Sequence, residues 1–248
     1  ALGFAPLQVL VIPDSVLVIG EDAFNQCSGL RSITIGKGVT KLDFNMFSCG
    51  WVEELTLPFV GESRDSTTNT HIGYILGATT YETNKNISQT LKSVVITDAT
   101  TIATNAFYGC ETVENIVIPD TVTSIGVEAF KNTKALKSIT LPFVGLEKET
   151  EVTQSFYKVF NQSAFAPIIP TTLTHVTILG GDHIDGNAFM DCESITHITL
   201  PATLERLDDL AFYRCSNLRV VNIADINAWC RITMREANTN PLIASPSA

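Results

Sequence analysis

The chain has 248 residues, of which 45% are hydrophobic and 17% are charged, and its formal net charge at pH 7 is -10. Its 16 basic residues stand against 26 acidic ones and form no cluster that would neutralise phosphate groups, so nucleic acid is not an expected partner. No stretch approaches the roughly 20 consecutive apolar residues that span a bilayer, so we expect no membrane span in this chain. Residues 1–6 have neither the basic start nor the apolar core of a signal peptide.

One sequence unit repeats along the chain and is clearest in residues 113–135, VENIVIPDTVTSIGVEAFKNTKA. Apolar residues occupy its positions 1, 4, 6, 10, 13, 17 and 18. A period of roughly 23 residues is typical of a solenoid, in which each rung packs on its neighbours. We therefore expect residues 1–248 to form one solenoid of about nine rungs. Rungs 1 to 9 begin at Leu7, Leu30, Val52, Leu91, Val113, Leu136, Leu173, Ile195 and Leu218.

The first side of each rung is predicted to be a short strand, because positions 4 and 6 share a face and β-branched residues surround them. Ile116 and Ile118 are an example. Proline or glycine usually follows at position 7, where it ends strand pairing. Apolar residues at positions 10 and 13, such as Val122 and Ile125, then carry the chain along a second side.

The third side of each rung is predicted to be a short helical turn that points an apolar pair inward. Stacking would place its phenylalanines in one column, which we interpret as core packing rather than a cofactor site. The pairs are Ala23-Phe24, Met46-Phe47, Ala106-Phe107, Ala129-Phe130, Ala188-Phe189 and Ala211-Phe212.

Two inserts, about residues 59–90 and 143–172, lengthen rungs 3 and 6. Both begin within the same five-residue sequence, Leu-Pro-Phe-Val-Gly, which indicates duplication of a three-rung block. Each insert also has three apolar residues with the i, i+3, i+4 spacing of one helical face, so we expect an enlarged version of the apolar turn. Residues 61–71 are predicted to be an exposed loop. The apolar residues are Ile72, Ile75 and Leu76 in insert 1, and Phe156, Val159 and Phe160 in insert 2.

The repeat changes near its end, and we expect residues 224–248 to close the solenoid. Asp225 would cap a short helix that carries Ile226, Trp229 and Cys230 inward. Four other cysteines recur at one place in their rungs, which favours buried free thiols over a disulfide scaffold. They are Cys27, Cys110, Cys192 and Cys215, and the last two lie in neighbouring rungs, where a bridge is sterically conceivable.

The outward positions of the strands, 3 and 5 in each rung, offer little catalytic chemistry. They form a neutral surface of Ser, Thr and Val with one carboxylate, Glu54, and two histidines, His175 and His197. These two imidazoles would stack on neighbouring strands, but two ligands fall short of a normal metal site. Asp182, His183 and Asp185 lie on a turn without a nucleophile partner, and no phosphate-loop, zinc-protease or serine-hydrolase signature occurs. We expect no enzyme, no cofactor and no metal.

The unit Val113-x-x-Ile116-x-Ile118-Pro119-x-x-Val122-x-x-Ile125-Gly126-x-x-Ala129-Phe130 resembles the leucine-rich repeat of type 5, the BspA-like family of bacterial surface proteins. The resemblance covers about residues 7–223. Two departures are that Thr133 replaces the usual cysteine and that insert 2 has no counterpart of the sequence Gly73-Tyr74-Ile75-Leu76-Gly77-Ala78 of insert 1. It implies an α/β leucine-rich-repeat solenoid, with parallel β-strands on one face and short helices or turns on the other. It also implies a secreted or cell-surface protein with a role in adhesion and no general catalytic motif.

Three hypotheses about function follow. The first is a non-catalytic extracellular or cell-surface module, a monomer, that binds a macromolecule such as a host, bacterial or matrix protein. The second is a glycan-binding module, which would use Tyr74, Tyr81 and Tyr157 of the inserts as aromatic platforms. The third is a passive spacer within a longer surface protein. The candidate binding surface is the pair of inserts, with His175 and His197 of the strand face as further candidates.

Overall fold

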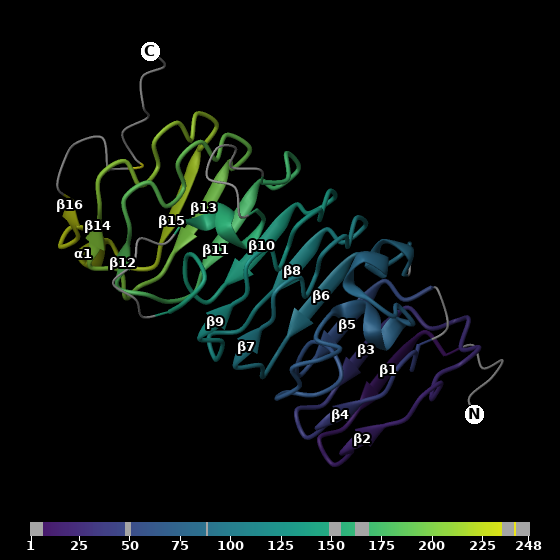
Figure 1. The fold of residues 1–248 in the computed structure, drawn as a ribbon. Coiled ribbons are helices and arrows are strands. Elements are labelled where there is room, and N and C mark those ends of the chain that lie inside the picture. Colours follow the sequence, from purple (N-terminus) through teal and green to yellow (C-terminus); the bar gives the residue numbers. More distant parts are fainter. Residues whose placement is uncertain are drawn as a thin grey trace.

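The computed structural model describes residues 7–47, 51–87, 89–148, 155–161, 169–234 and 241. A nine-stranded parallel sheet runs the length of an elongated stack of rungs, and its first and last strands lie at opposite ends (Figure 1). Every strand of this sheet starts at position 3 of a predicted rung, which confirms the nine-rung solenoid. In spatial order the strands are β1 (Val9–Ile12), β3 (Ser32–Ile35), β5 (Glu54–Leu57), β6 (Ser93–Ile96), β8 (Asn115–Val117), β10 (Ser138–Leu141), β11 (His175–Ile178), β13 (His197–Leu200) and β15 (Val220–Ile223).

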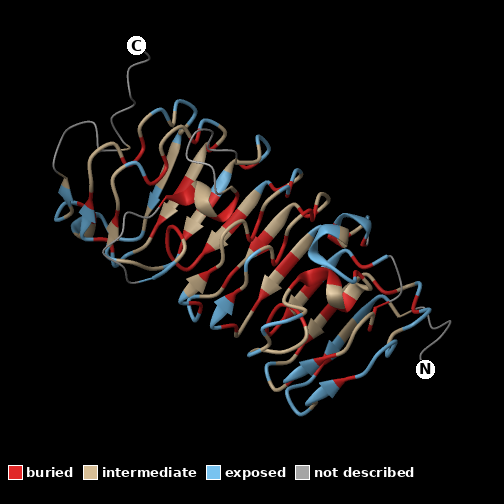
Figure 2. Cartoon of the chain, viewed as in Figure 1, coloured by how far each residue is buried: buried red, intermediate tan, exposed pale blue. Residues whose placement is uncertain are grey.

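The strands pair in register, so each template position stacks on its equivalent in the next rung. Ser138, for example, pairs with Asn115 on one side and with His175 on the other. Because side chains alternate between the two faces of a strand, Ile116 is completely buried while Asn115 is partly exposed. The buried positions form a continuous core inside the stack (Figure 2).

The second side of the rungs also forms short strands, which the sequence analysis treated as a simple crossing. They are grouped in three small sheets, because the inserts interrupt the ladder at rungs 3 and 6. At these rungs the backbone of the insert accepts the hydrogen bonds from the preceding rung. The amide of Leu42 donates to the carbonyl of Glu62 at 2.8 Å, and the amide of Ile125 donates to the carbonyl of Leu146 at 2.7 Å. The strands are β2 (Val18–Ile19) with β4 (Lys41–Leu42), β7 (Thr101–Ile102) with β9 (Ser124–Ile125), and β12 (His183–Ile184) with β14 (Arg206–Leu207) and β16 (Thr233–Met234).

The predicted helical turn on the third side is wrong, because the described apolar pairs lie in consecutive tight turns. Asn105 before Phe107 has a φ of 59°, and Gly109 after it has a φ of 69°. Such left-handed residues break a helix. The turns are instead joined to one another, as where the amide of Phe107 donates to the carbonyl of Ala129 in the next rung at 2.7 Å.

The phenylalanine column is confirmed. Phe107 and Phe130 have ring centroids 5.4 Å apart, and Phe189 and Phe212 have centroids 5.2 Å apart with nearly parallel planes. Phe24, in the first rung, stacks on Phe47 at 5.1 Å but is only partly buried. Each ring therefore contributes to the burial of its neighbour.

Both inserts fill the column with 3₁₀ helices, which confirms that they replace the apolar turns. In η1 (Ile72–Leu76), Ile72 and Ile75 are fully buried. In η3 (Phe156–Val159), Phe156 lies with its ring centroid 5.0 Å from that of Phe189. Insert 1 contains a further 3₁₀ helix, η2 (Tyr81–Asn86).

Residues 61–71 form a loop that is exposed at Asp65, Thr67 and Thr68, as predicted, but the loop is also anchored to the solenoid. Arg64 donates to the carbonyl of Lys37 at 2.7 Å, and its guanidinium lies 2.6 Å from the carboxylate of Asp98. The same guanidinium covers the ring of Phe59 at 5.5 Å, and His71 at the end of the segment is buried. The polar composition did not indicate this anchoring, because the polar groups bind partners in neighbouring rungs.

After β15, Asp225 caps the short helix α1 (Ile226–Trp229), and its carboxylate accepts from the amide of Asn227 at 2.9 Å. Trp229 points inward as expected, but Ile226 is 60% exposed and Cys230 is exposed. The inward prediction for these two residues is wrong, because this one-turn helix presents a single residue to the core. The expectation for residues 235–240 and 242–248 lies outside the described residues.

Candidate functional site

The outward face of the nine-stranded sheet is a regular surface that crosses all nine rungs. Its position-5 column consists mostly of Thr and Val, and the in-register pairs Thr140 with Thr177 and Thr177 with Thr199 continue it across β10, β11 and β13. Polar side chains in the position-3 column bond along the ladder: Ser138 donates to the Oδ1 of Asn115 at 2.7 Å. The face is therefore weakly polar, and its side chains include a hydrogen bond between neighbouring strands.

His175 and His197 lie together on this face, as predicted. Their ring centroids are 4.3 Å apart and the rings are within 10° of parallel. The Nδ1 atoms lie 2.8 Å from the hydroxyls of Thr174 and Thr196, which fix the ring orientations. The described residues contain no group of three or more His, Cys, Asp or Glu side chains arranged to hold a metal ion.

The three candidate tyrosines do not form one platform. Tyr74 in η1 is half-buried against Phe44, with ring centroids 5.5 Å apart. Tyr81 in η2 is 36% exposed and meets the edge of Tyr108 at 5.4 Å. Tyr157 in η3 is half-buried. The two tyrosines of insert 1 therefore lie on separate 3₁₀ helices, and Tyr157 lies in the other insert.

Trp51 is an exposed aromatic residue that the sequence analysis missed. Its side chain is 52% exposed, and the guanidinium of Arg31 lies 5.9 Å from its ring. It immediately precedes Val52, the first apolar residue of rung 3. The other rungs have a small or polar residue or proline at this position. An aromatic residue at an outward template position is the signal that could have identified it.

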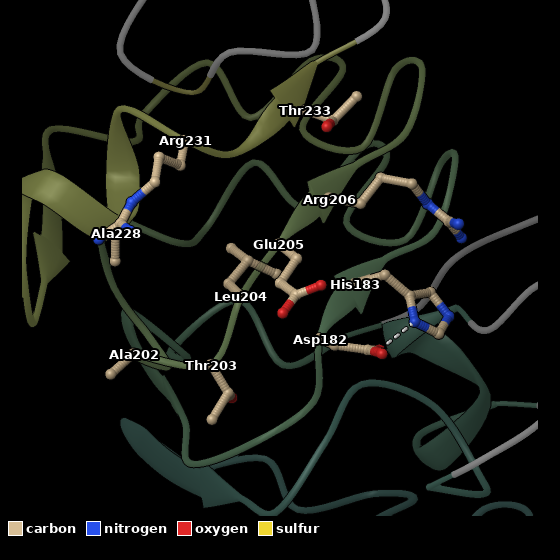
Figure 3. A pocket seen from close by; sticks show the side chains of 10 residues that line it. All are labelled: Asp182, His183, Ala202, Thr203, Leu204, Glu205, Arg206, Ala228, Arg231 and Thr233. Atoms are coloured by element: carbon tan, nitrogen blue, oxygen red, sulfur yellow. Dashed lines mark hydrogen bonds and ion pairs between the residues drawn. The ribbon is translucent and has the colours of Figure 1, made fainter.

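A cleft of about 540 Å³ opens between the second side of rung 8 and the closing segment (Figure 3). Leu204, Ala202 and Ala228 contribute apolar surface, while charged side chains of both signs surround it. The Nδ1 of His183 lies 2.6 Å from the carboxylate of Asp182. The described lining contains no serine or cysteine, and its hydroxyl groups belong to Thr233 and to Thr203, which donates to the carbonyl of Gly181 at 2.7 Å.

The four cysteines that recur in the repeat lie in the interior of the stack. Cys27, Cys110 and Cys192 are buried, Cys215 is half-buried, and Cys192 and Cys215 are not bridged. Burial raises the pKa of Cys215 to about 12 and also raises the pKa values of Cys110 and Cys192, which suppresses their thiolates. Cys215 Sγ lies 3.1 Å from the carbonyl oxygen of Phe189, as expected of a packed thiol.

Rungs of this geometry define a leucine-rich-repeat solenoid, a class that serves as binding or structural modules. The BspA type leucine rich repeat region matches residues 3–70 and 85–227 in six copies, so the chain belongs to that family. None of the curated proteins matches the chain significantly. Within the described residues, no helix has the length and apolarity needed to cross a membrane.

Solved structures of similar fold come from bacterial and other sources. A leucine rich cell surface protein from Faecalibacterium prausnitzii is 20% identical, over 92% of this chain and 62% of its own, with a TM-score of 0.38. An internalin from Listeria monocytogenes is 14% identical, over 86% of this chain and 63% of its own, with a TM-score of 0.41. TLR13, solved with ssRNA13, is 15% identical over 88% of this chain and 28% of its own, with a TM-score of 0.59. The chain thus spans less than two thirds of each of these proteins, and the similarity to TLR13 supports the fold alone.

Proposed function

We propose that this chain is a non-catalytic binding module of an extracellular or cell-surface protein and that it recognises a protein partner through the strand face. The observation that carries the proposal is the unbroken sheet: nine in-register strands, at about 4.8 Å each, give a face roughly 40 Å long. A face of that length can supply the roughly 800 Å² per partner of a standard interface without moving. Its Thr and Val columns carry no charge, so a partner that binds there desolvates no ionised group of these columns.

Membership of the BspA-type family supports the extracellular setting. The non-catalytic part of the proposal rests on the sparse chemistry of the described cleft, where the Asp182–His183 pair has no serine or cysteine beside it and the hydroxyl of Thr203 already donates to Gly181. The net charge of -10 disfavours a nucleic-acid ligand such as that of TLR13.

A glycan-binding module is the second candidate, and one observation favours it. Trp51 and Tyr81 are both exposed large aromatic residues, at the start of rung 3 and in its insert. Aromatic rings that expose a face are suited to stacking on sugars. In this case the sugar would bind at Trp51 or at Tyr81 of insert 1 and not on the strand face.

The two candidates are separated by binding assays of the purified chain against arrays of extracellular-matrix and cell-surface proteins and of glycans. The protein-binding proposal expects a saturable protein ligand whose binding survives Trp51→Ala with Tyr81→Ala. Saturable glycan binding that this double variant abolishes would replace it with the second candidate. Absence of any saturable ligand would favour a passive spacer.

A further inference from the structure

The two inserts place different residues at one structurally equivalent position. His71 follows Phe59 in insert 1 at the same sequence distance at which Ser155 follows Phe143 in insert 2. Each is the extended residue immediately before a 3₁₀ helix, η1 or η3. Both are buried, with exposures of 6% and 8%. The chain therefore carries a titratable group in one insert and a non-titratable one at the matching place in the other.

His71 ties η1 to η2 through a buried hydrogen bond. Its Nδ1 lies 2.7 Å from the Oδ1 of Asn84, which is completely buried. A carboxamide oxygen accepts only, so Nδ1 carries the proton and donates. Gly73 makes room for this contact, because a β-carbon there would lie 2.1 Å from the Asn84 oxygen. The Asn84 Nδ2 has no hydrogen-bond partner among the described residues, so the pair is already incompletely satisfied.

The surroundings of His71 disfavour a positive charge. Burial is the largest effect and lowers the pKa of His71, whereas the bond to Asn84 and the carboxylate of Glu82 in η2 oppose that shift without overcoming it. Lys85 of η2 and Glu111 of rung 4 line the small space beside Asn84, and Glu111 pairs with Lys134 at 2.7 Å. A protonated imidazole would thus be buried with little compensation.

We propose that insert 1 is an acid-labile element, in which protonation of His71 opens η1 and η2 locally while insert 2 stays packed. Opening would withdraw Ile72 and Ile75 from the gap between the turns of rungs 2 and 4, where the amide of Phe47 donates to Ile75 and that of Ile72 donates to Ala106. The exposed Tyr81 would move with η2.

The direction of the pH dependence follows from proton linkage. The ordinary histidine pKa is 6.5, and the opened insert binds the proton more tightly than the closed one. Closure is therefore fully stable above that pH and weakens as the pH falls below it. Each decrease of one pH unit raises the equilibrium constant for opening about tenfold, until the pH reaches the pKa of His71 in the closed insert.

Hydrogen exchange at pH 7.5 and 5.0, corrected for the intrinsic pH dependence, tests the proposal. Peptides covering residues 71–86 should lose protection by about tenfold or more relative to peptides covering residues 155–161, which serve as the internal control. In His71→Ser, which copies insert 2, this relative loss should disappear. Equal pH responses of the two inserts in the unmodified chain, or a relative loss that persists in His71→Ser, would overturn it.

A second measurement keeps the test valid if His71→Ser folds poorly. Titration of the unmodified chain by NMR should give a His71 pKa below the ordinary histidine value of 6.5. A His71 pKa at or above that value would overturn the proposal. Neither measurement depends on the partner, so both are independent of the proposed function.

Discussion

The rings of Phe107 and Phe130 lie with centroids 5.4 Å apart and planes inclined by 22°. Both residues are completely buried, although each belongs to a different rung. Neither rung could bury its phenylalanine alone, so the stability of the solenoid lies largely between rungs.

The column predicts a large loss of stability on truncation of Phe130. Phe130→Ala should lower the free energy of unfolding by about 3–5 kcal/mol, because the cavity would lie between rings that cannot collapse into it. The strand-face control Thr177→Ala should cost less than about 1 kcal/mol, since its side chain points outward. Urea denaturation of both variants measures the difference. Similar losses would show that the inward and outward faces have been assigned wrongly.

The left-handed turn residues predict a stabilising substitution. Leu210 and Asn187 occupy equivalent places before Phe212 and Phe189, and both have a φ of 61°. A branched side chain there costs roughly 1 kcal/mol that asparagine largely avoids. Leu210→Asn should therefore raise the thermal midpoint, and Asn187→Leu should lower it. Shifts of the same sign in calorimetry would argue against backbone strain as the cause.

Residues 61–71 are held to neighbouring rungs by the guanidinium group of Arg64, and we expect its planar geometry to be required. Arg64→Ala should cost about 1–3 kcal/mol, because it removes hydrogen bonds to Asp98 and to the carbonyl of Lys37 together with the contact to Phe59. Arg64→Lys should recover only part of this, since an ammonium cannot reach both partners. Limited proteolysis between residues 61 and 71, alongside denaturation, reports the loosening. Full recovery by lysine would mean that charge alone is responsible.

Thiol reactivity should separate the exposed cysteine from the buried ones. Cys230 is exposed, whereas burial raises the pKa of Cys215 to about 12. At pH 8 only about one Cys215 side chain in ten thousand would be a thiolate. Iodoacetamide at pH 8 should therefore modify Cys230 before Cys110, Cys192 and Cys215, which should react only after unfolding. Mass mapping that finds early modification of Cys215 would show that its rung opens.

The repeat pattern predicted much of the fold, because apolar positions that recur at a nearly constant period leave few arrangements other than stacked rungs. The start of each strand and the phenylalanine column follow directly from it. The third side was misread because the pair Ala106-Phe107 has helical spacing, while Asn105 at positive φ ends the helix before it forms. Arg64 could not be placed from the sequence, since its partner Asp98 is 34 residues away.

The candidate site was less predictable than the fold. The stacking of His175 on His197 follows from the strand register. The hydrogen bond between His71 and Asn84 does not, because it joins two irregular segments of insert 1 that have no repeat to align them.

The most direct test of the binding proposal is to alter the strand face without altering the core. Thr140 and Thr177 are paired on neighbouring strands with outward side chains, so Thr140→Arg with Thr177→Arg should leave the circular dichroism and the thermal midpoint nearly unchanged. We predict that surface plasmon resonance against the protein ligand found by array screening will then show at least about a hundredfold weaker binding, because the two arginine side chains would introduce steric clashes and desolvated charges into the interface. Unchanged affinity for that ligand in the folded double variant would contradict the proposal.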